Sequence, residues 1–90
     1  MVKHLNITIT GKVQGVYFRA SAHVEAVRNG VYGFARNEPN GDVFIEAEGE
    51  GEGLSHFLEW CSKGPERAKV DRILVEEGDL CNYHSFEIRR

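Results

Sequence analysis

The tetrapeptide EPNG at 38–41 constrains the fold of this chain more than any other feature. Proline fixes its own backbone angle and an Asn-Gly pair tolerates positive φ, so this sequence favours a tight turn between antiparallel strands. The segments on either side, VYGFARN at 31–37 and DVFIEAE at 42–48, have strand-like composition, and the second alternates apolar with polar residues. We therefore predict a β-hairpin formed by these two neighbouring strands.

A strand and a helix are predicted before the hairpin. In the segment KHLNITIT at 3–10 the apolar residues alternate with polar ones, which is the pattern of a half-buried strand. From 18 to 28 the apolar spacing changes to i, i+4, i+7, which predicts an amphipathic helix. Its expected buried face consists of Ala20, Val24 and Val27. The Asn29-Gly30 pair that follows is suited to the end of a helix.

A second helix and two further strands are predicted after the hairpin. Apolar residues at helical spacing predict a helix over 52–63, and the glycines of GEGEG at 49–53 predict a loose connection before it. The segment 68–77 has the pattern of a strand, and a change of apolar parity between its residues 70 and 73 predicts a β-bulge. A short final strand is expected over 85–89.

The order up to residue 77, strand-helix-strand-strand-helix-strand, is that of the ferredoxin-like α+β fold, to which 85–89 would add a short final strand. Two right-handed crossovers place both helices on one face of an antiparallel sheet. A chain of 90 residues has room for one core, so we expect a single domain over 1–90. In this topology the first helix begins at the edge where the second strand ends. The loop GKVQGVYF at 11–18 should therefore lie beside Arg36 and Asn37.

This loop is the candidate functional site. Gly11 and Gly15 permit backbone conformations closed to other residues, so the amides after them can turn inward at the positive end of a helix. Such a nest binds anions, and the planar guanidinium of Arg19 suits two phosphate oxygens. Lys12 and Arg36 are expected to add positive potential nearby. The candidate phosphate-binding residues are Gln14, Gly15, Val16, Tyr17, Phe18 and Arg19.

Spacing alone also allows a plainer interpretation of the loop. The glycines would then only turn the chain, and Arg19 would be a solvated helix residue. The expected position of Asn37 beside the loop favours a site. Nucleotide binding is not indicated, because neither GxxxxGK[ST] nor GxGxxG occurs.

Composition excludes several classes of partner. The chain has 11 basic and 14 acidic residues and a formal net charge of −3, so it lacks the global positive field that attracts nucleic acid or anionic lipid. The first ten residues alternate polar with apolar side chains and lack the continuous apolar run of a signal peptide or membrane span. We expect a cytoplasmic protein that contacts neither nucleic acid nor membrane.

The potential metal ligands are scattered along the sequence. Cys61 and Cys81 have no CxxC spacing and are expected to be free thiols. The histidines, at positions 4, 23, 56 and 84, form no HxxxH or HExxH pair and are expected at the surface or its rim. The acidic run EAEGEGE at 46–52 lacks EF-hand spacing and is expected to be a solvated strand end and loop. No metal or other cofactor is predicted.

At the candidate site the sequence resembles the acylphosphatase family. The matching segments are GKVQGVYFR at 11–19, GFARN at 33–37, NGDV at 40–43, the pattern LxxFLEW at 54–60 and FEIR at 86–89. The resemblance implies the ferredoxin-like fold and hydrolysis of small acyl phosphates to a carboxylate and inorganic phosphate. It also implies that Arg19 and the backbone of 14–19 hold the phosphate, and that Asn37 holds the attacking water. We expect a monomer.

Two other functions stay open at this point. The same fold serves RNA-recognition modules, and GVYGFAR at 30–36 loosely imitates their aromatic strand motif. That motif belongs on the third strand, however, and its partner strand at 3–10 has no aromatic residue. A regulatory domain that binds a small phosphorylated ligand would use Arg19 equally well. Asn37 favours catalysis, because binding alone needs no residue to position water.

Overall fold

The computed structural model describes all 90 residues, and its elements follow the predicted order. In chain order they are β1 (Val2–Lys12), α1 (Phe18–Arg28), β2 (Tyr32–Asn37), β3 (Val43–Glu50), α2 (Gly51–Lys63), β4 (Lys69–Gly78) and β5 (Phe86–Arg89). Each boundary lies within two residues of the predicted one. Neither helix has the length and apolar character needed to cross a membrane.

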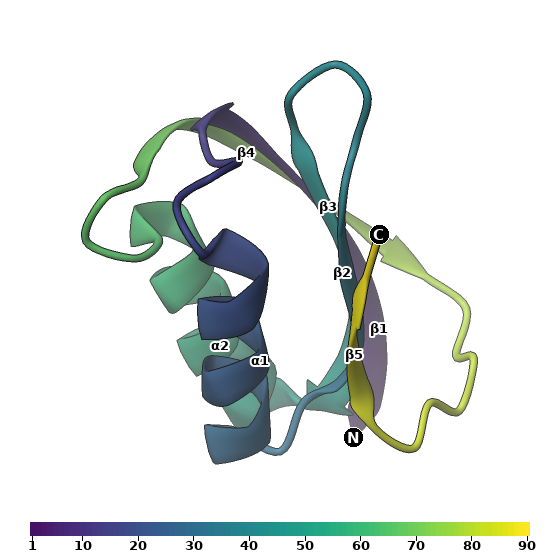
Figure 1. The fold of residues 1–90 in the computed structure, drawn as a ribbon. Coiled ribbons are helices and arrows are strands. Elements are labelled where there is room, and N and C mark those ends of the chain that lie inside the picture. The colour runs from purple at the N-terminus through teal and green to yellow at the C-terminus, as the bar shows by residue number, and fades with distance from the viewer.

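The five strands form one sheet in the order β4-β1-β3-β2-β5. Both helices pack on the same face of this sheet (Figure 1), which confirms the ferredoxin-like α+β fold. The pairs β1–β3, β1–β4 and β2–β3 are antiparallel, but β5 runs parallel to β2, so the sheet is mixed rather than antiparallel throughout. The predicted bulge is present, because Asp71 of β4 has no partner between the residues that pair with Thr10 and Gly11.

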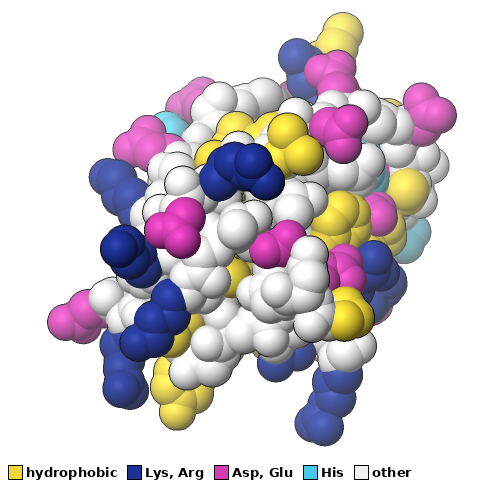
Figure 2. Space-filling view, turned by 90° about the horizontal axis from the view of Figure 1, so that it is seen from above, with side chains coloured by type: hydrophobic (Ala, Val, Ile, Leu, Met, Phe, Trp, Pro, Cys, Tyr) yellow, Lys and Arg dark blue, Asp and Glu magenta, His cyan; other side chains and the backbone are white.

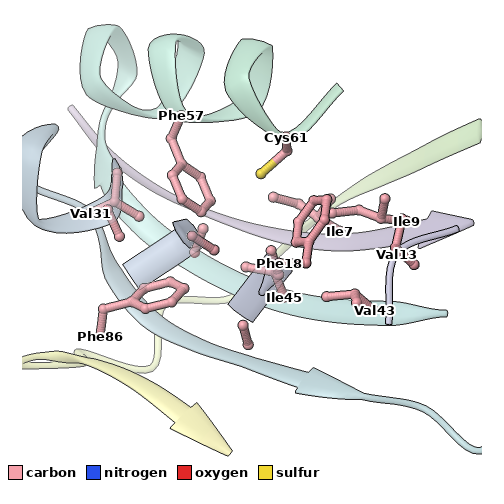
Figure 3. Close-up of a cluster of buried hydrophobic side chains, with 14 of the residues drawn as sticks. Ile7, Ile9, Val13, Phe18, Val31, Val43, Ile45, Phe57, Cys61 and Phe86 are labelled. Atoms are coloured by element: carbon pink, nitrogen blue, oxygen red, sulfur yellow. The ribbon is translucent and has the colours of Figure 1, made fainter. Parts of the chain in front are cut away.

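The core lies between the helices and the sheet (Figure 3). Phe57 and Cys61 point from α2 toward the strands, and Phe18 fills the space at the start of α1. The large side chains that are fully buried are Phe18, Phe57, Ile7, Ile9, Ile45, Val13, Val31, Val43 and Cys61. Burial of each such side chain contributes about 1.5–3 kcal/mol. Because Val13 and Phe18 are both in this set, the loop between β1 and α1 is anchored at both ends.

The buried face of α1 differs from the predicted one. The residues that face the core are Phe18, Ala22 and Ala26, whereas the predicted set of Ala20, Val24 and Val27 is exposed. Both sets have helical spacing, so periodicity alone could not choose between them. Burial of the large Phe18 ring decides the rotation of the helix, and the small alanines let the helix pack closely on the sheet.

The predicted loose connection at 49–53 is wrong. β3 continues to Glu50 and α2 begins directly at Gly51. A Cβ atom on Gly53 would lie 2.3 Å from the carbonyl oxygen of Asn29, so only glycine lets the first turn of α2 approach the end of α1 this closely. Gly53, and Gly49 with a Cβ position 3.1 Å from the carbonyl oxygen of Gly30, therefore serve close packing, whereas a Cβ on Gly51 would lie in open space.

His4 and Glu48 are buried on the sheet face opposite the helices, which corrects two predictions. Each residue is 3% exposed, and His4 Nδ1 lies 2.7 Å from Glu48 Oε2. The segment between β4 and β5 covers the pair, because the main-chain N–H groups of Cys81 and Tyr83 donate to the Glu48 carboxylate. His4 is therefore not a surface histidine, and the acidic run at 46–52 is not entirely solvated.

The contacts of this pair favour its charged form. Burial alone opposes protonation of His4, but hydrogen bonds to Glu48 and Asn6 outweigh burial and raise the pKa of the imidazole above its ordinary value. Burial likewise opposes ionisation of Glu48. The N–H of Cys81, the imidazole and the N–H of Tyr83 together lower the pKa of that carboxyl below its ordinary value.

The two cysteines are expected to react at very different rates. Cys61 is buried and burial raises the pKa of its thiol, whereas Cys81 is exposed. Only the thiolate is nucleophilic, so the native protein should show one fast thiol with Ellman's reagent and a second only after unfolding. Cys81→Ser should abolish the fast reaction. A fast thiol that persists in this variant would contradict the assignment.

Candidate active site

The loop of residues 14–19 joins β1 to α1 and includes the first two residues of the helix. It turns at two left-handed positions, Gly15 with φ of 73° and Tyr17 with φ of 63°. Glycine adopts this conformation freely, but for tyrosine it costs about 1 kcal/mol or more. The Tyr17 side chain is 74% exposed, so burial of its ring does not offset that cost. Strain of this kind is concentrated at functional sites.

The main-chain N–H groups of the 14–19 loop are available to a ligand. Those of residues 14–17 donate to no protein acceptor. The first N–H groups of a helix also lack acceptors within the helix, and α1 has neither a side-chain cap nor an acidic residue in its first turn. The positive end of the helix is therefore not neutralised locally, which favours binding of an oxyanion.

Arg19 is oriented by the last strand. Its Nη1 donates to the carbonyl oxygen of Arg89 on β5 across 2.7 Å. The guanidinium has further N–H groups beyond the one used in this bond, and they can donate to a ligand. The half-buried side chain is thus held at the sheet edge with donors to spare.

Asn37, the last residue of β2, lies beside the loop as predicted. The side-chain hydrogen bonds of this region come from Gln14, Arg19 and Arg36 and leave the Asn37 carboxamide without a protein partner. A cavity of about 360 Å³ is lined by Val13, Gly15, Tyr17, Phe18, Arg19, Ala20, Asn37 and Ile88. A guanidinium and a free carboxamide therefore face one space of the size that binds a small molecule.

Three of the predicted phosphate-binding residues have side chains engaged elsewhere. Gln14 Nε2 donates to the carbonyl oxygens of Glu38, at 2.8 Å, and Asp42, at 2.9 Å. The Val16 and Phe18 side chains are buried in the core. Gln14 thus fastens the loop to the β2–β3 hairpin, and these three residues have only their main chain to offer a bound anion.

Arg36 and Lys12 do not line the cavity, which corrects the expectation that they add charge to it. Side chains alternate along a strand, so Arg36 lies on the face of β2 opposite Asn37. Its Nε forms an ion pair with Glu38 at 3.1 Å, and its guanidinium carbon lies 4.9 Å from the centre of the Phe44 ring.

β5 contributes two groups to the site that sequence reasoning missed. Ile88 lines the cavity, and Arg89 supplies the carbonyl oxygen that holds Arg19. The only signal in the sequence was the match of FEIR at 86–89, which gives no role to a main-chain carbonyl. Figure 2, which views the molecule from above, shows Lys and Arg side chains interspersed with Asp and Glu. Attraction of an anion must therefore come from the local donors.

Several known proteins resemble this chain over most of its length. The acylphosphatase family model matches residues 5–88. An acylphosphatase of a Nocardioides species is 42% identical over 85 residues, which cover 94% of this chain and 86% of that protein. An acylphosphatase of Marinobacter nauticus is 46% identical over 76 residues, or 84% of this chain and 83% of that protein. The crystal structure of acylphosphatase from Bacillus subtilis has a TM-score of 0.95 at 35% identity, with 100% of both chains covered. The chain belongs to the acylphosphatase family.

Proposed function

We propose that this protein hydrolyses acyl phosphates to a carboxylate and inorganic phosphate. In this proposal the 14–19 loop and Arg19 hold the phosphoryl group, and Asn37 positions the attacking water. The observation that carries it is the shared cavity, whose lining includes residues with unpaired main-chain donors, the Arg19 side chain and a carboxamide without a protein partner. Family membership supplies the reaction class.

The phosphoryl group is held by directed donors rather than by net charge. The N–H groups of the loop and the guanidinium of Arg19 would donate to the non-bridging oxygens and stabilise the charge that develops on them during transfer. Since Arg19 is already fixed by Arg89, its donors need not be ordered when substrate binds.

The attacking water needs a partner that can both accept and donate hydrogen bonds, and a carboxamide does both. Asn37 would hold this water in line with the breaking bond. The water oxygen bonds to phosphorus, the bond from phosphorus to the acyl oxygen breaks, and the carboxylate leaves with the electron pair. The water proton passes to a phosphate oxygen. A carboxylate is a weak base and departs without a general acid, so no protein acid or base is required.

The direct test is release of inorganic phosphate from benzoyl phosphate at neutral pH in the presence of EDTA. We expect catalysed release, with a rate that changes little with pH near neutrality because no titrating side chain takes part. Release no faster than without protein would refute the function. A rate that follows the titration of one histidine would refute the proposed proton path but leave the reaction class standing.

We further propose that the enzyme acts as a single-domain monomer in the cytoplasm, without nucleic acid. All of the proposed catalytic groups come from one chain, so no partner subunit is needed to complete the site. The free thiols of Cys61 and Cys81 suit a reducing compartment. The net charge of −3 gives no general attraction for polyanions.

A further inference from the structure

Three side chains with different metal-binding atoms meet on the sheet face opposite the helices. His4 comes from β1, Glu48 from β3, and Cys81 from the segment between β4 and β5, which runs along this side of the sheet in Figure 1. One ligand atom from each residue lies within 4.8 Å of the others. None of the three lines the active-site cavity. Sequence spacing could not reveal this cluster, because its members come from three distant segments.

The imidazole of His4 is oriented as metal-binding histidines are. Its Nε2 lies 2.8 Å from Asn6 Oδ1, and because that oxygen can only accept, Nε2 carries a hydrogen. This bond fixes the ring and leaves Nδ1 directed at Glu48. A hydrogen bond from the non-ligating nitrogen to a fixed acceptor is the usual second partner of a metal-bound histidine.

The Glu48 carboxylate is also fixed before any ion arrives. It accepts hydrogen bonds from the main-chain N–H groups of Cys81 and Tyr83, the latter at 3.1 Å. These bonds bring the Cys81 thiol beside the carboxylate and still leave lone pairs on both oxygens. His4 and Glu48 are 3% exposed whereas Cys81 is exposed, so the cluster has buried ligands on one side and access for an ion on the other.

The geometry needs only a small adjustment. Ligand atoms around a tetrahedral zinc ion lie roughly 3.3–3.7 Å apart, given bonds of about 2.0–2.3 Å. Closing the longest separation, up to 4.8 Å, requires movement of about 1 Å, which the exposed Cys81 side chain can supply by rotation. The distance of 2.7 Å between His4 Nδ1 and Glu48 Oε2 must instead widen by about 0.6 Å to admit the ion between them. Imidazole nitrogen, thiolate sulfur and carboxylate oxygen together form a donor set that suits Zn²⁺ and Co²⁺ better than Mg²⁺ or Ca²⁺.

We propose that His4 Nδ1, a Glu48 carboxylate oxygen and Cys81 Sγ bind one Zn²⁺ ion, with water as the fourth ligand. Binding replaces the proton between His4 and Glu48 and the proton of the Cys81 thiol, and both are released to solvent. The ion would tie the segment between β4 and β5 to β1 and β3. Since that segment leads into β5, the site would stabilise the strand that holds Arg19 without taking part in the reaction.

The test is titration of the reduced, metal-free full chain with Zn²⁺ by calorimetry and with Co²⁺ by absorption spectroscopy. We expect one ion per chain with a Kd of about 1–10 μM, and a near-ultraviolet charge-transfer band from thiolate to cobalt. Zn²⁺ should also protect Cys81 from Ellman's reagent. The variants Cys81→Ser and His4→Gln should each bind at least ~10-fold more weakly, and Cys81→Ser should lose the band.

The matched control is His84→Gln, which removes an exposed histidine from the same covering segment and should leave the Kd unchanged. Cys81→Ser alters an exposed side chain, so it keeps the test informative if His4→Gln unfolds. A wild-type Kd weaker than about 100 μM, or binding that Cys81→Ser does not weaken, would overturn the site. Neither result affects the phosphate-release assay, which is run in EDTA.

Discussion

Replacing Arg19 with alanine is expected to lower kcat/KM for benzoyl phosphate by about 10³-fold or more, through loss of both substrate binding and turnover. The guanidinium is the only charged side chain lining the 360 Å³ cavity, although Arg90 lines an adjoining hollow together with Arg19, Asn37 and Ile88. Comparable arginines in phosphoryl transfer contribute on this scale. Arg19→Lys should recover little of the loss. A lysine ammonium is a point charge and lacks the planar arrangement of donors that lets a guanidinium bind two phosphate oxygens side by side while another N–H bonds to Arg89.

Steady-state kinetics and inhibition by inorganic phosphate would measure this effect. The inhibition constant for phosphate should rise together with KM, because both depend on the contact between the Arg19 guanidinium and the phosphate oxygens. Arg28→Ala is the matched control, since Arg28 lies at the other end of α1 with its side chain 70% exposed. Turnover that stays at the wild-type level in Arg19→Ala would show that the phosphate site has been misassigned.

Replacing Asn37 with alanine should act mainly on kcat. We expect a decrease of about 10²- to 10³-fold, the scale for removal of one preorganised polar group, with only a modest change in KM. The contrast with Arg19 follows from geometry, because the carboxamide is proposed to contact the water and not the phosphate. The circular dichroism spectrum should be unchanged, since Asn37 forms no side-chain bond within the protein.

Asn40→Ala provides the control for Asn37→Ala. Asn40 lies in the nearby hairpin turn, and its side chain bonds only to Asp42 within that turn. Loss of this contact should lower stability slightly and leave kcat unchanged. If the two variants have equal kcat, Asn37 does not position the water.

The order of elements was predictable because each segment carries its own signal. Alternation in 3–10, helical spacing in 52–63 and the turn at 38–41 are local patterns, and the chirality of the crossovers then limits the topology. The same reasoning placed Asn37 beside the 11–18 loop, because both lie at ends of elements that must share one edge of the sheet. The bulge at Asp71 was predictable too, because the apolar residues on either side of it switch between even and odd positions.

Features that depend on contacts between distant segments were not predictable. The core-facing side of α1 is the one that buries Phe18, and Val24 and Val27 are exposed as a result. Helical spacing fits both faces equally, so it could not show which one would be buried. His4 and Glu48 have the alternation of solvent-facing residues, and the irregular segment around Cys81 buries them. The spacing of apolar residues shows which side chains share one face of a helix or strand. Whether that face is buried depends on which other segment packs against it.

The bond from Arg19 to the carbonyl of Arg89 links folding to ligand binding. It joins positions 70 residues apart, so an intermediate in which β5 has not docked lacks the acceptor that orients the guanidinium. Phosphate should therefore bind the complete fold in preference to such intermediates, and by mass action it should slow opening of the β2–β5 edge. Amide hydrogen exchange in 86–89 should then slow when phosphate binds, although the groups proposed to bind phosphate lie near the other end of the chain, at 14–19.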